Sequence, residues 1–367
     1  MKNNMKIVIC PDSFKGTLTA RRAAEIIKDA ATAAIPGVRC VIVPMADGGE
    51  GTADALGAER VPCRVTGPYG DPVDSFFGVL GDAAVIELSA SSGLTLTDRR
   101  DPVNATTRGA GELFLAAADR GFCKFILALG GSATNDCGCG MASACGVRFL
   151  DREGRRFTPV GGTLRDVASI DASRLDARLR GAEIRVMCDV DNPLFGPCGA
   201  AFVFAPQKGA DEETVRLLDE GLRSVSKVIR RDLGVNVSDL PGAGAAGGCG
   251  AGALAFFCGA LMSGADAVLD SVGFDGLLAD ADLCVSGEGR FDSQSARGKA
   301  VSAVAARAAA RGVPVVVFCG TREDGATVRG VTDVVPIGRF PIPPDKIADY
   351  AERFLYETAF ETFSKSI

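Results

Sequence analysis

Histidine and tryptophan are absent from the 367-residue chain, and tyrosine occurs only three times. Without histidine, the chain cannot carry a Ser-His-Asp or Cys-His catalytic centre, a histidine general base or a histidine-ligated metal. Carboxylates, lysines, arginines, hydroxyls, amides and backbone N–H groups remain for chemistry. These groups suit phosphoryl transfer, in which positioning and charge stabilisation with Mg²⁺ supply most of the catalysis.

Runs rich in lysine and arginine are also missing, and the formal net charge is −6. This charge disfavours nucleic acid and anionic membranes as partners. No apolar stretch reaches the length of a transmembrane helix, and the apolar run at 7–10 is too short for a signal peptide. Several of the thirteen cysteines lie inside apolar runs, so we expect reduced thiols in a cytoplasmic protein.

The two ends of the chain share a pattern that predicts parallel α/β structure. A strand at 6–10, a helix at 19–35 and a strand at 38–43 form a βαβ unit. From about residue 282 the strand and helix spacing returns, with a last helix at 345–363. The middle differs, because short strands separated by glycine, proline and aspartate turns predict an antiparallel meander at 64–66, 75–80 and 83–88.

We therefore predict an α/β protein of two domains. A doubly wound parallel-sheet domain of Rossmann or flavodoxin type is expected from residues 1–58 and 281–367, and a mixed α+β domain inserted at 59–280. A tandem pair of domains is the alternative. The active site is expected in the cleft between the two domains.

Polar loops follow six apolar runs that are typical of strands, the run at 202–204 among them, and all of these loops except 189–194 contain glycine. These loops are residues 11–16, 46–52, 130–136, 189–194, 207–210 and 287–299. In α/β proteins, ligands bind beyond the carboxyl ends of strands, where backbone N–H groups and helix dipoles favour anions. One such loop is a turn, but six indicate a shared binding cleft.

Three motifs that suggest other functions do not hold. Gly242–Gly247 fits G-x-G-x-x-G but follows Asp239-Leu240-Pro241 instead of a strand, so it is no dinucleotide fingerprint. Anion binding at a helix start and close packing of a glycine-rich helix both remain open for it. Gly298-Lys299 lacks the rest of a phosphate-binding P-loop. The Cys137-Gly138-Cys139 sequence has no second cluster to complete a metal site.

Taken together, the loop sequences resemble those of the type-1 glycerate kinase family, collinearly from about residue 5 to residue 320. The motifs are Pro-Asp-Ser-Phe-Lys-Gly at 11–16, Ala-Asp-Gly-Gly-Glu-Gly-Thr at 46–52, Gly-Gly-Ser-Ala-Thr-Asn-Asp at 130–136, Asp-Val-Asp-Asn-Pro-Leu at 189–194, Gln-Lys-Gly-Ala at 207–210, Pro-Gly-Ala-Gly-Ala-Ala-Gly-Gly at 241–248 and Gly-Glu-Gly-Arg-x-Asp-x-Gln at 287–294. The resemblance implies a two-domain α/β fold and ATP-dependent phosphorylation of D-glycerate, usually to 2-phosphoglycerate.

The residue roles follow from side-chain chemistry and from the loops. Lysines beside glycines suit phosphate, paired carboxylates suit Mg²⁺ or a base, and an arginine fork suits the glycerate carboxylate. The predicted catalytic residues are Lys15, Asp189, Lys208, Glu288, Arg290 and Asp292. The predicted ATP-binding residues are Asp12, Ser13, Gly48, Gly49, Gly131, Ser132, Asn135, Gly244, Gly247 and Lys299. The predicted Mg²⁺ ligands are Asp47, Glu50 and Asp191.

Each assignment has a structural alternative. Asp189 and Asp191 could form an Asx-turn before Pro193. Lys15 and Lys208 could be solvated loop lysines, and Lys299 could be a solvated lysine at a helix start. At the level of the whole protein, the alternatives are a kinase of a related small hydroxy acid, an inactive nucleotide- or glycerate-binding regulator and a nicotinamide dehydrogenase. Small-molecule substrates are expected in place of nucleic acid or membrane, and a homodimer is left open.

Overall fold

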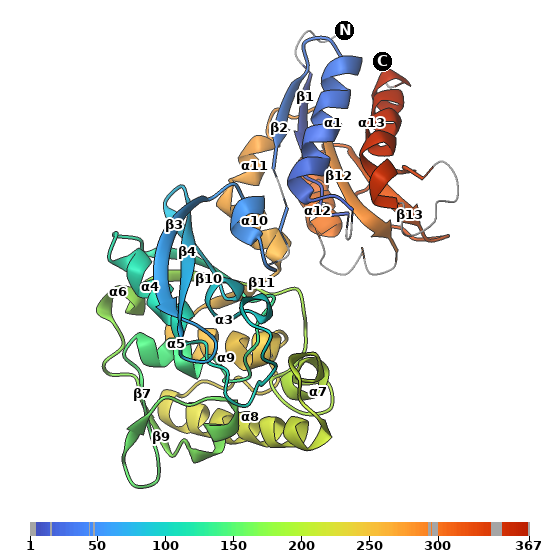
Figure 1. Cartoon of the computed structure of the whole chain (residues 1–367). Coiled ribbons are helices and arrows are strands. Elements are labelled where there is room, and N and C mark those ends of the chain that lie inside the picture. The colour runs from blue at the N-terminus through green and yellow to red at the C-terminus, as the bar shows by residue number, and fades with distance from the viewer. Residues whose placement is uncertain are drawn as a thin grey trace. The chain divides into compact units, whose positions relative to one another are not determined.

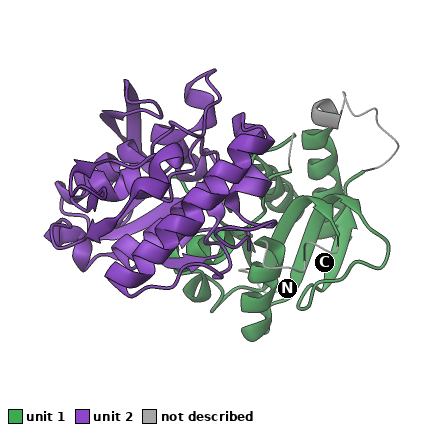
Figure 2. Ribbon diagram, turned by 90° about the horizontal axis from the view of Figure 1, so that it is seen from below, with its two compact units in different colours: residues 1–47, 55–57, 263–367 green, residues 48–54, 58–262 purple. Residues whose placement is uncertain are grey.

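The computed structural model divides the chain into two compact units (Figure 2). Unit 1 comprises residues 1–47, 55–57 and 263–367, and unit 2 comprises residues 48–54 and 58–262. The structure describes residues 5–14, 17–43, 45–46, 48–292, 295, 300–338 and 347–365. Each unit has its own sheet and its own hydrophobic core.

Unit 1 contains a five-stranded parallel sheet in the order β14-β13-β12-β1-β2 (Figure 1). Its strands are β1 (Lys6–Ile9), β2 (Arg39–Ile42), β12 (Leu283–Phe291), β13 (Val315–Arg322) and β14 (Asp333–Pro336). Ile9 of β1 pairs with Ile42 of β2 on one side and with Val285 of β12 on the other. The prediction that both chain ends build one parallel sheet is confirmed.

Helices cover both faces of the unit 1 sheet. They are α1 (Ala20–Ala34), α12 (Ala300–Ala310) and α13 (Ile347–Lys365), with the shorter α10 (Gly264–Ser271) and α11 (Phe274–Leu277). α1 and α13 lie side by side (Figure 1) and bury Ile7 and Ile9 of β1. Because strand side chains alternate, the buried Val8 and Val317 belong to the other face, where α12 packs against β12 and β13.

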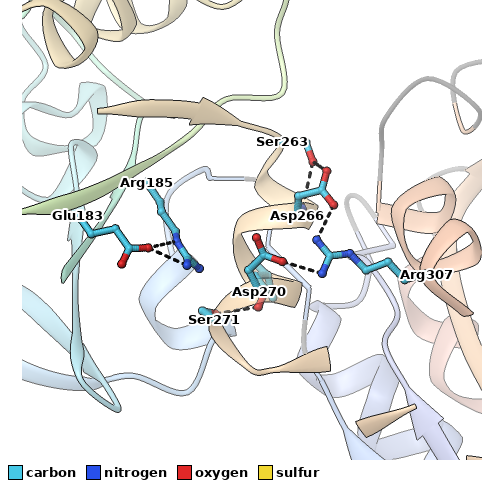
Figure 3. A network of polar contacts seen from close by, with 8 residues as sticks. Glu183, Arg185, Ser263, Asp266, Asp270, Ser271 and Arg307 are labelled. Carbon is cyan, nitrogen blue, oxygen red and sulfur yellow. Dashed lines mark hydrogen bonds and ion pairs between the residues drawn. The ribbon is translucent and has the colours of Figure 1, made fainter. Parts of the chain in front are cut away.

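Arg307 of α12 ties the short helix α10 to unit 1 (Figure 3). Its Nη2 donates to Asp266 Oδ1 at 2.9 Å, and its Nη1 lies 2.6 Å from Asp270 Oδ1. Ser263 caps α10, since its Oγ accepts a hydrogen bond from the N–H of Asp266 at 3.0 Å. These contacts explain why residues 263–280 pack in unit 1, although the sequence placed the end of the inserted domain at 280.

Unit 2 contains a mixed six-stranded sheet in the order β11-β10-β6-β5-β4-β3. Its strands are β3 (Glu59–Thr66), β4 (Pro72–Leu80), β5 (Ala83–Glu87), β6 (Lys124–Ala128), β10 (Glu183–Met187) and β11 (Ala260–Met262). The predicted meander forms the antiparallel part, and β5, β6, β10 and β11 run parallel. A second, three-stranded sheet consists of β7 (Arg148–Leu150), β8 (Arg156–Phe157) and β9 (Ser169–Asp171).

The helices of unit 2 pack around a core rich in phenylalanine. They are α2 (Thr52–Ala55), α3 (Ser89–Ser92), α4 (Arg108–Ala118), α5 (Cys139–Ala144), α6 (Ala177–Arg180), α7 (Ala200–Phe204), α8 (Glu212–Leu233) and α9 (Ala245–Phe257). Phe114 of α4 stacks on Phe257 of α9 with ring centroids 5.7 Å apart. Helix α8 begins after Asp211, whose Oδ1 accepts from the N–H of Thr214 at 2.8 Å. None of the described helices is long and apolar enough to cross a membrane.

Two expectations about local structure were wrong. The run at 202–204, expected as a strand, belongs to helix α7, where the neighbouring Phe202 and Val203 are both exposed. A short apolar run fits a strand or a helix equally well, and packing against α8 and α9 decides it. The loop expected from residue 287 begins later, because β12 continues to Phe291. A Cβ on Gly320 of β13 would lie 2.5 Å from the carbonyl oxygen of Gly289, so glycine at 320 lets β12 and β13 approach closely there.

Candidate active site

The carboxyl ends of β5, β6 and β10 meet at one edge of the unit 2 sheet, and the glycine-rich loop 48–53 packs on this edge. The N–H of Gly130 donates to the carbonyl oxygen of Gly48 at 2.8 Å. A Cβ on Gly48 would lie only 2.9 Å from Cβ of Met187, and its φ of +79° favours glycine. A Cβ on Gly130 would lie 2.5 Å from Cα of Gly49. The glycines of this motif therefore permit close packing of the loop.

Glu87, the last residue of β5, holds loop 48–53 through a buried carboxylate. Its Oε2 accepts from the N–H of Gly51 at 2.9 Å, and its Oε1 accepts from the N–H of Ala53 at 2.6 Å. Glu50, a predicted Mg²⁺ ligand, lies on this loop and accepts a hydrogen bond from Thr95 Oγ1 at 3.3 Å. The backbone around Glu50 is thus fixed to the sheet edge.

The loop after β6 is fixed by backbone hydrogen bonds to the segment that follows β5. The N–H of Leu94 donates to the carbonyl oxygen of Gly131 at 2.9 Å, and the N–H of Ala133 donates to that of Ser92 at 2.9 Å. Gly131 has a φ of +75°, so a side chain there would be strained. Of the predicted ATP-binding residues, Gly48, Gly49, Gly131 and Ser132 therefore lie in two loops at one sheet edge.

Lys208 holds the loop after β6 through hydrogen bonds from a buried side chain. It ends the short 3₁₀ helix η3 (Pro206–Lys208), and only 2% of the residue is exposed. Its Nζ donates to Ser132 Oγ at 3.0 Å and to the carbonyl oxygen of Thr134 at 2.7 Å. Burial lowers the pKa of Lys208 to about 8, because the charged form loses its hydration. Lys208 is therefore not a solvated loop lysine, whereas a direct phosphate contact remains a prediction.

Asn135 is fully buried and follows Thr134, whose carbonyl oxygen accepts the hydrogen bond from Lys208. Neither Nδ2 nor Oδ1 of Asn135 has a hydrogen-bond partner among the residues that the structure describes. Leaving such a group unsatisfied costs about 1–3 kcal/mol, and native proteins keep few of them. This unsatisfied amide supports the prediction that Asn135 serves a ligand.

The loop after β10 carries the predicted acidic pair. Asp189 and Asp191 are exposed, and Asn192 Nδ2 donates to the carbonyl oxygen of Cys198 at 2.8 Å. The backbone of this loop is held by the glycine motif, since the N–H of Gly244 donates to the carbonyl oxygen of Asn192 at 3.0 Å. Two carboxylates are thus presented to solvent on an anchored backbone.

The glycine motif at 242–247 packs against neighbouring loops. A Cβ on Gly244 would lie 2.3 Å from the carbonyl oxygen of Pro193, and one on Gly247 would lie 2.1 Å from that of Thr134. Gly247 also has a φ of +67°. Close packing therefore explains both glycines, and ATP binding by them remains a prediction. The motif joins the loop after β10 to the loop after β6.

The carboxyl end of the unit 1 sheet carries a second set of predicted residues. The N–H of Asp12 donates to the carbonyl oxygen of Gly287 at 2.8 Å, which places Asp12 and Ser13 beside β12. Glu288 is 8% exposed on β12, whereas the Arg290 side chain is 68% exposed with its Nε 3.2 Å from Asp292 Oδ2. An exposed guanidinium with a carboxylate beside it can rearrange onto an anionic ligand.

Three predicted residues, Lys15, Asp47 and Lys299, lie outside the described residues. The others form two groups. In unit 2 the group is Gly48, Gly49, Glu50, Gly131, Ser132, Asn135, Asp189, Asp191, Lys208, Gly244 and Gly247, and in unit 1 it is Asp12, Ser13, Glu288, Arg290 and Asp292.

The sequence reasoning missed Glu87 and Asp136, both buried carboxylates that organise loops in unit 2. Glu87 is the last residue of an apolar strand, and Asp136 is the last residue of the motif at 130–136. The position of each residue in the sequence could therefore have marked it as a candidate. A charged residue at the end of an apolar run is buried only if it meets donors, and those donors come from distant segments.

The comparison with known proteins decides the family. The model of the glycerate kinase family matches residues 7–365. The chain belongs to the glycerate kinase family. Its activity is that of a glycerate kinase, a phosphotransferase, and the family implies ATP as the phosphate donor.

Relatives of this family resemble the chain over most of its length. It is 44% identical over 366 residues to a protein named glycerate kinase from Bacillus subtilis (strain 168), covering 97% of this chain and 96% of the relative. It is 44% identical to a glycerate 2-kinase from Escherichia coli (strain K12), covering 88% and 87%. A crystal structure of a protein from Salmonella typhimurium LT2, provisionally named glycerate kinase 2, has a TM-score of 0.88, 40% identity and coverage of 99% and 98%.

Proposed function

We propose that the protein transfers the γ-phosphoryl group of ATP to the 2-hydroxyl of D-glycerate, giving 2-phosphoglycerate. The observation that carries the proposal is the match to the glycerate kinase family across residues 7–365. The name of the E. coli relative, glycerate 2-kinase, supports the 2-hydroxyl as the acceptor. A cytoplasmic location remains a prediction from the sequence, and a homodimer remains open.

The donor set suits the charges of this reaction. Lys208 supplies a buried cation, and the exposed guanidinium of Arg290 suits a carboxylate. Asp189 is assigned as the group that orients or deprotonates the attacking hydroxyl. The glycines at 242–247 contact protein backbone, which disfavours the nicotinamide alternative.

Mg²⁺ is the metal that this chemistry needs, and the carboxylates of unit 2 fit it. The described residues contain no group of three His, Cys, Asp or Glu side chains that could hold a metal ion. Mg²⁺ needs no such group, because it usually binds one or two carboxylates together with substrate phosphates and water. Glu50 and Asp191 are assigned as these ligands, and Asp47 is assigned with them from its motif. The bound ion would neutralise charge on the phosphates.

A coupled assay and a product analysis test the proposal. The purified protein with Mg²⁺ and ATP should consume ATP only when D-glycerate is added, and ³¹P spectroscopy should identify 2-phosphoglycerate. L-glycerate and a longer hydroxy acid serve as comparison substrates. Formation of 3-phosphoglycerate would overturn the assigned hydroxyl, and faster turnover of another hydroxy acid would favour the related-kinase alternative. ATP consumption independent of D-glycerate, or none, would refute the proposal.

Arg290→Lys is expected to raise the KM for D-glycerate about tenfold with a smaller change in kcat. A bidentate guanidinium contact to a carboxylate becomes a point charge in this variant. Arg64→Lys, which alters an exposed arginine of β3, is the control. Steady-state kinetics with each substrate varied in turn measures the effect. A defect confined to ATP would show that Arg290 binds the nucleotide instead.

A further inference from the structure

Asp136 holds its loop through a carboxylate whose two oxygens both accept hydrogen bonds. Its Oδ2 accepts from the N–H of Thr107 at 2.8 Å, from Thr107 Oγ1 at 2.9 Å and from the N–H of Gly140 at 3.2 Å. Its Oδ1 accepts from the N–H of Gly138 at 3.1 Å. Burial raises the pKa of Asp136, and the four donors around its carboxylate oppose this rise because they stabilise the charged form. Asp136 thereby ties the loop after β6 to the starts of α4 and α5.

Lys208 donates hydrogen bonds to the same loop, and the charge of Asp136 acts on it. Thr134, whose carbonyl oxygen accepts from Lys208 Nζ, lies two residues before Asp136. Among the described residues, the titratable groups that face Lys208 are Asp136 from this loop and Cys249 from α9. Burial raises the pKa of Cys249 well above its usual value, so this thiol stays neutral. Asp136 is therefore the anion that faces the buried lysine.

Both loop contacts and charge point to one role. We propose that Asp136 is a positioning residue for the kinase reaction, which holds the loop 130–136 in place and acts as the counter-charge to Lys208, the buried cation that donates to the same loop. The inference rests on the proposed function, in which Lys208 is the buried cation of the site. Asp136 itself does not touch substrate, because its residue is 0% exposed and four protein donors use its oxygens.

The geometry also explains why another residue would not serve. A Cβ on Gly140 would lie 2.8 Å from Asp136 Oδ2, so the carboxylate fills the space beside the helix start. An asparagine keeps the shape but turns one acceptor into an NH₂ group that faces N–H donors. It also removes the negative charge opposite Lys208, whose pKa the Asp136 carboxylate raises against the effect of burial.

The decisive experiment compares kcat against pH for wild type and Asp136→Asn, with D-glycerate and ATP saturating. We expect kcat at pH 7.5 to fall about tenfold or more, and the alkaline limb to move to lower pH by about half a unit or more. The control is Asp232→Asn, which removes another carboxylate of unit 2 that accepts a backbone N–H, that of Ile170 at 2.8 Å. This control should keep both the kcat and the limb of wild type. A wild-type limb in folded Asp136→Asn would overturn the inference.

A second pair of variants decides the case if Asp136→Asn does not fold. Thr107→Val removes one donor to the carboxylate but leaves its charge, whereas Thr107→Ser keeps the hydroxyl. We expect a severalfold lower kcat in Thr107→Val with an unmoved alkaline limb, and kcat close to wild type in Thr107→Ser. A wild-type kcat in folded Thr107→Val would overturn the positioning role. An inactive wild type would refute the proposed function instead, so the two failures are distinguishable.

Discussion

Replacing Lys208 by methionine is expected to lower kcat by about a hundredfold or more. The variant removes the buried cation and the donor that Nζ provides to Ser132 Oγ and to the carbonyl oxygen of Thr134. An unsatisfied buried acceptor destabilises by about 1–3 kcal/mol, but the loss of a buried charge offsets part of this. We therefore expect a folded protein with a small shift in Tm and a large defect in kcat.

Wild-type kcat should also fall as the pH rises through about 8. Burial lowers the pKa of Lys208 to about 8, so the protonated form that the reaction needs is lost above this value. Below this pH the enzyme keeps its activity. The titration of Lys208 therefore gives the plot of kcat against pH a descending alkaline limb. Lys124→Met, at an exposed lysine that pairs with Asp82 at 2.5 Å, is the matched control and should keep wild-type kinetics. A kcat within threefold of wild type in Lys208→Met would show that Lys208 is only structural.

Asp189→Asn is expected to lower kcat by about a hundredfold or more, if Asp189 acts as the base or binds the metal. The substitution keeps the shape of the side chain and removes its charge. Because Asp189 is exposed on a loop whose backbone is held by the glycine motif, we expect little change in Tm. Steady-state kinetics and thermal unfolding measure the two quantities.

A matched substitution makes the Asp189 result specific. Asp119→Asn changes an exposed aspartate at the end of α4, which pairs with Arg178, and should leave kcat unchanged. Raising the Mg²⁺ concentration separates the two roles of Asp189: rescue of kcat indicates a metal ligand, and no rescue indicates a base. A kcat near wild type in Asp189→Asn would show that this residue is wrongly assigned.

Much of the fold followed from local pattern. The spacing of apolar residues predicted α1, and apolar runs predicted most strands of the two larger sheets. The errors fell where a pattern fits two structures. The run at 202–204 became α7, and the residues at 287–291 remained in β12 because β13 pairs with them. Partner segments far away in the sequence decide such cases, so local composition could not.

The candidate residues were found mainly by their motifs, but their local roles depended on contacts. Lys208 looked like a loop lysine that could reach phosphate, whereas in the structure it is buried and braces the loop after β6. The glycines at 244 and 247 fit an anion-binding motif, whereas each has a carbonyl oxygen packed against it. A glycine in the sequence indicates that a Cβ would clash or that the backbone has an unusual φ. The segment with which a Cβ would clash lies far away in the sequence, so only the structure identifies it.

The sequence by itself determined the class of chemistry, the parallel sheet shared by the two chain ends and the family. Histidine is absent, and the motifs are collinear over most of the chain. Only the tertiary structure decided which carboxylates are buried and what they hold. Glu87 and Asp136 are stable inside unit 2 because backbone N–H groups from other segments surround them. The folded chain alone creates such an environment, since burying a charge without these donors would cost more than folding supplies.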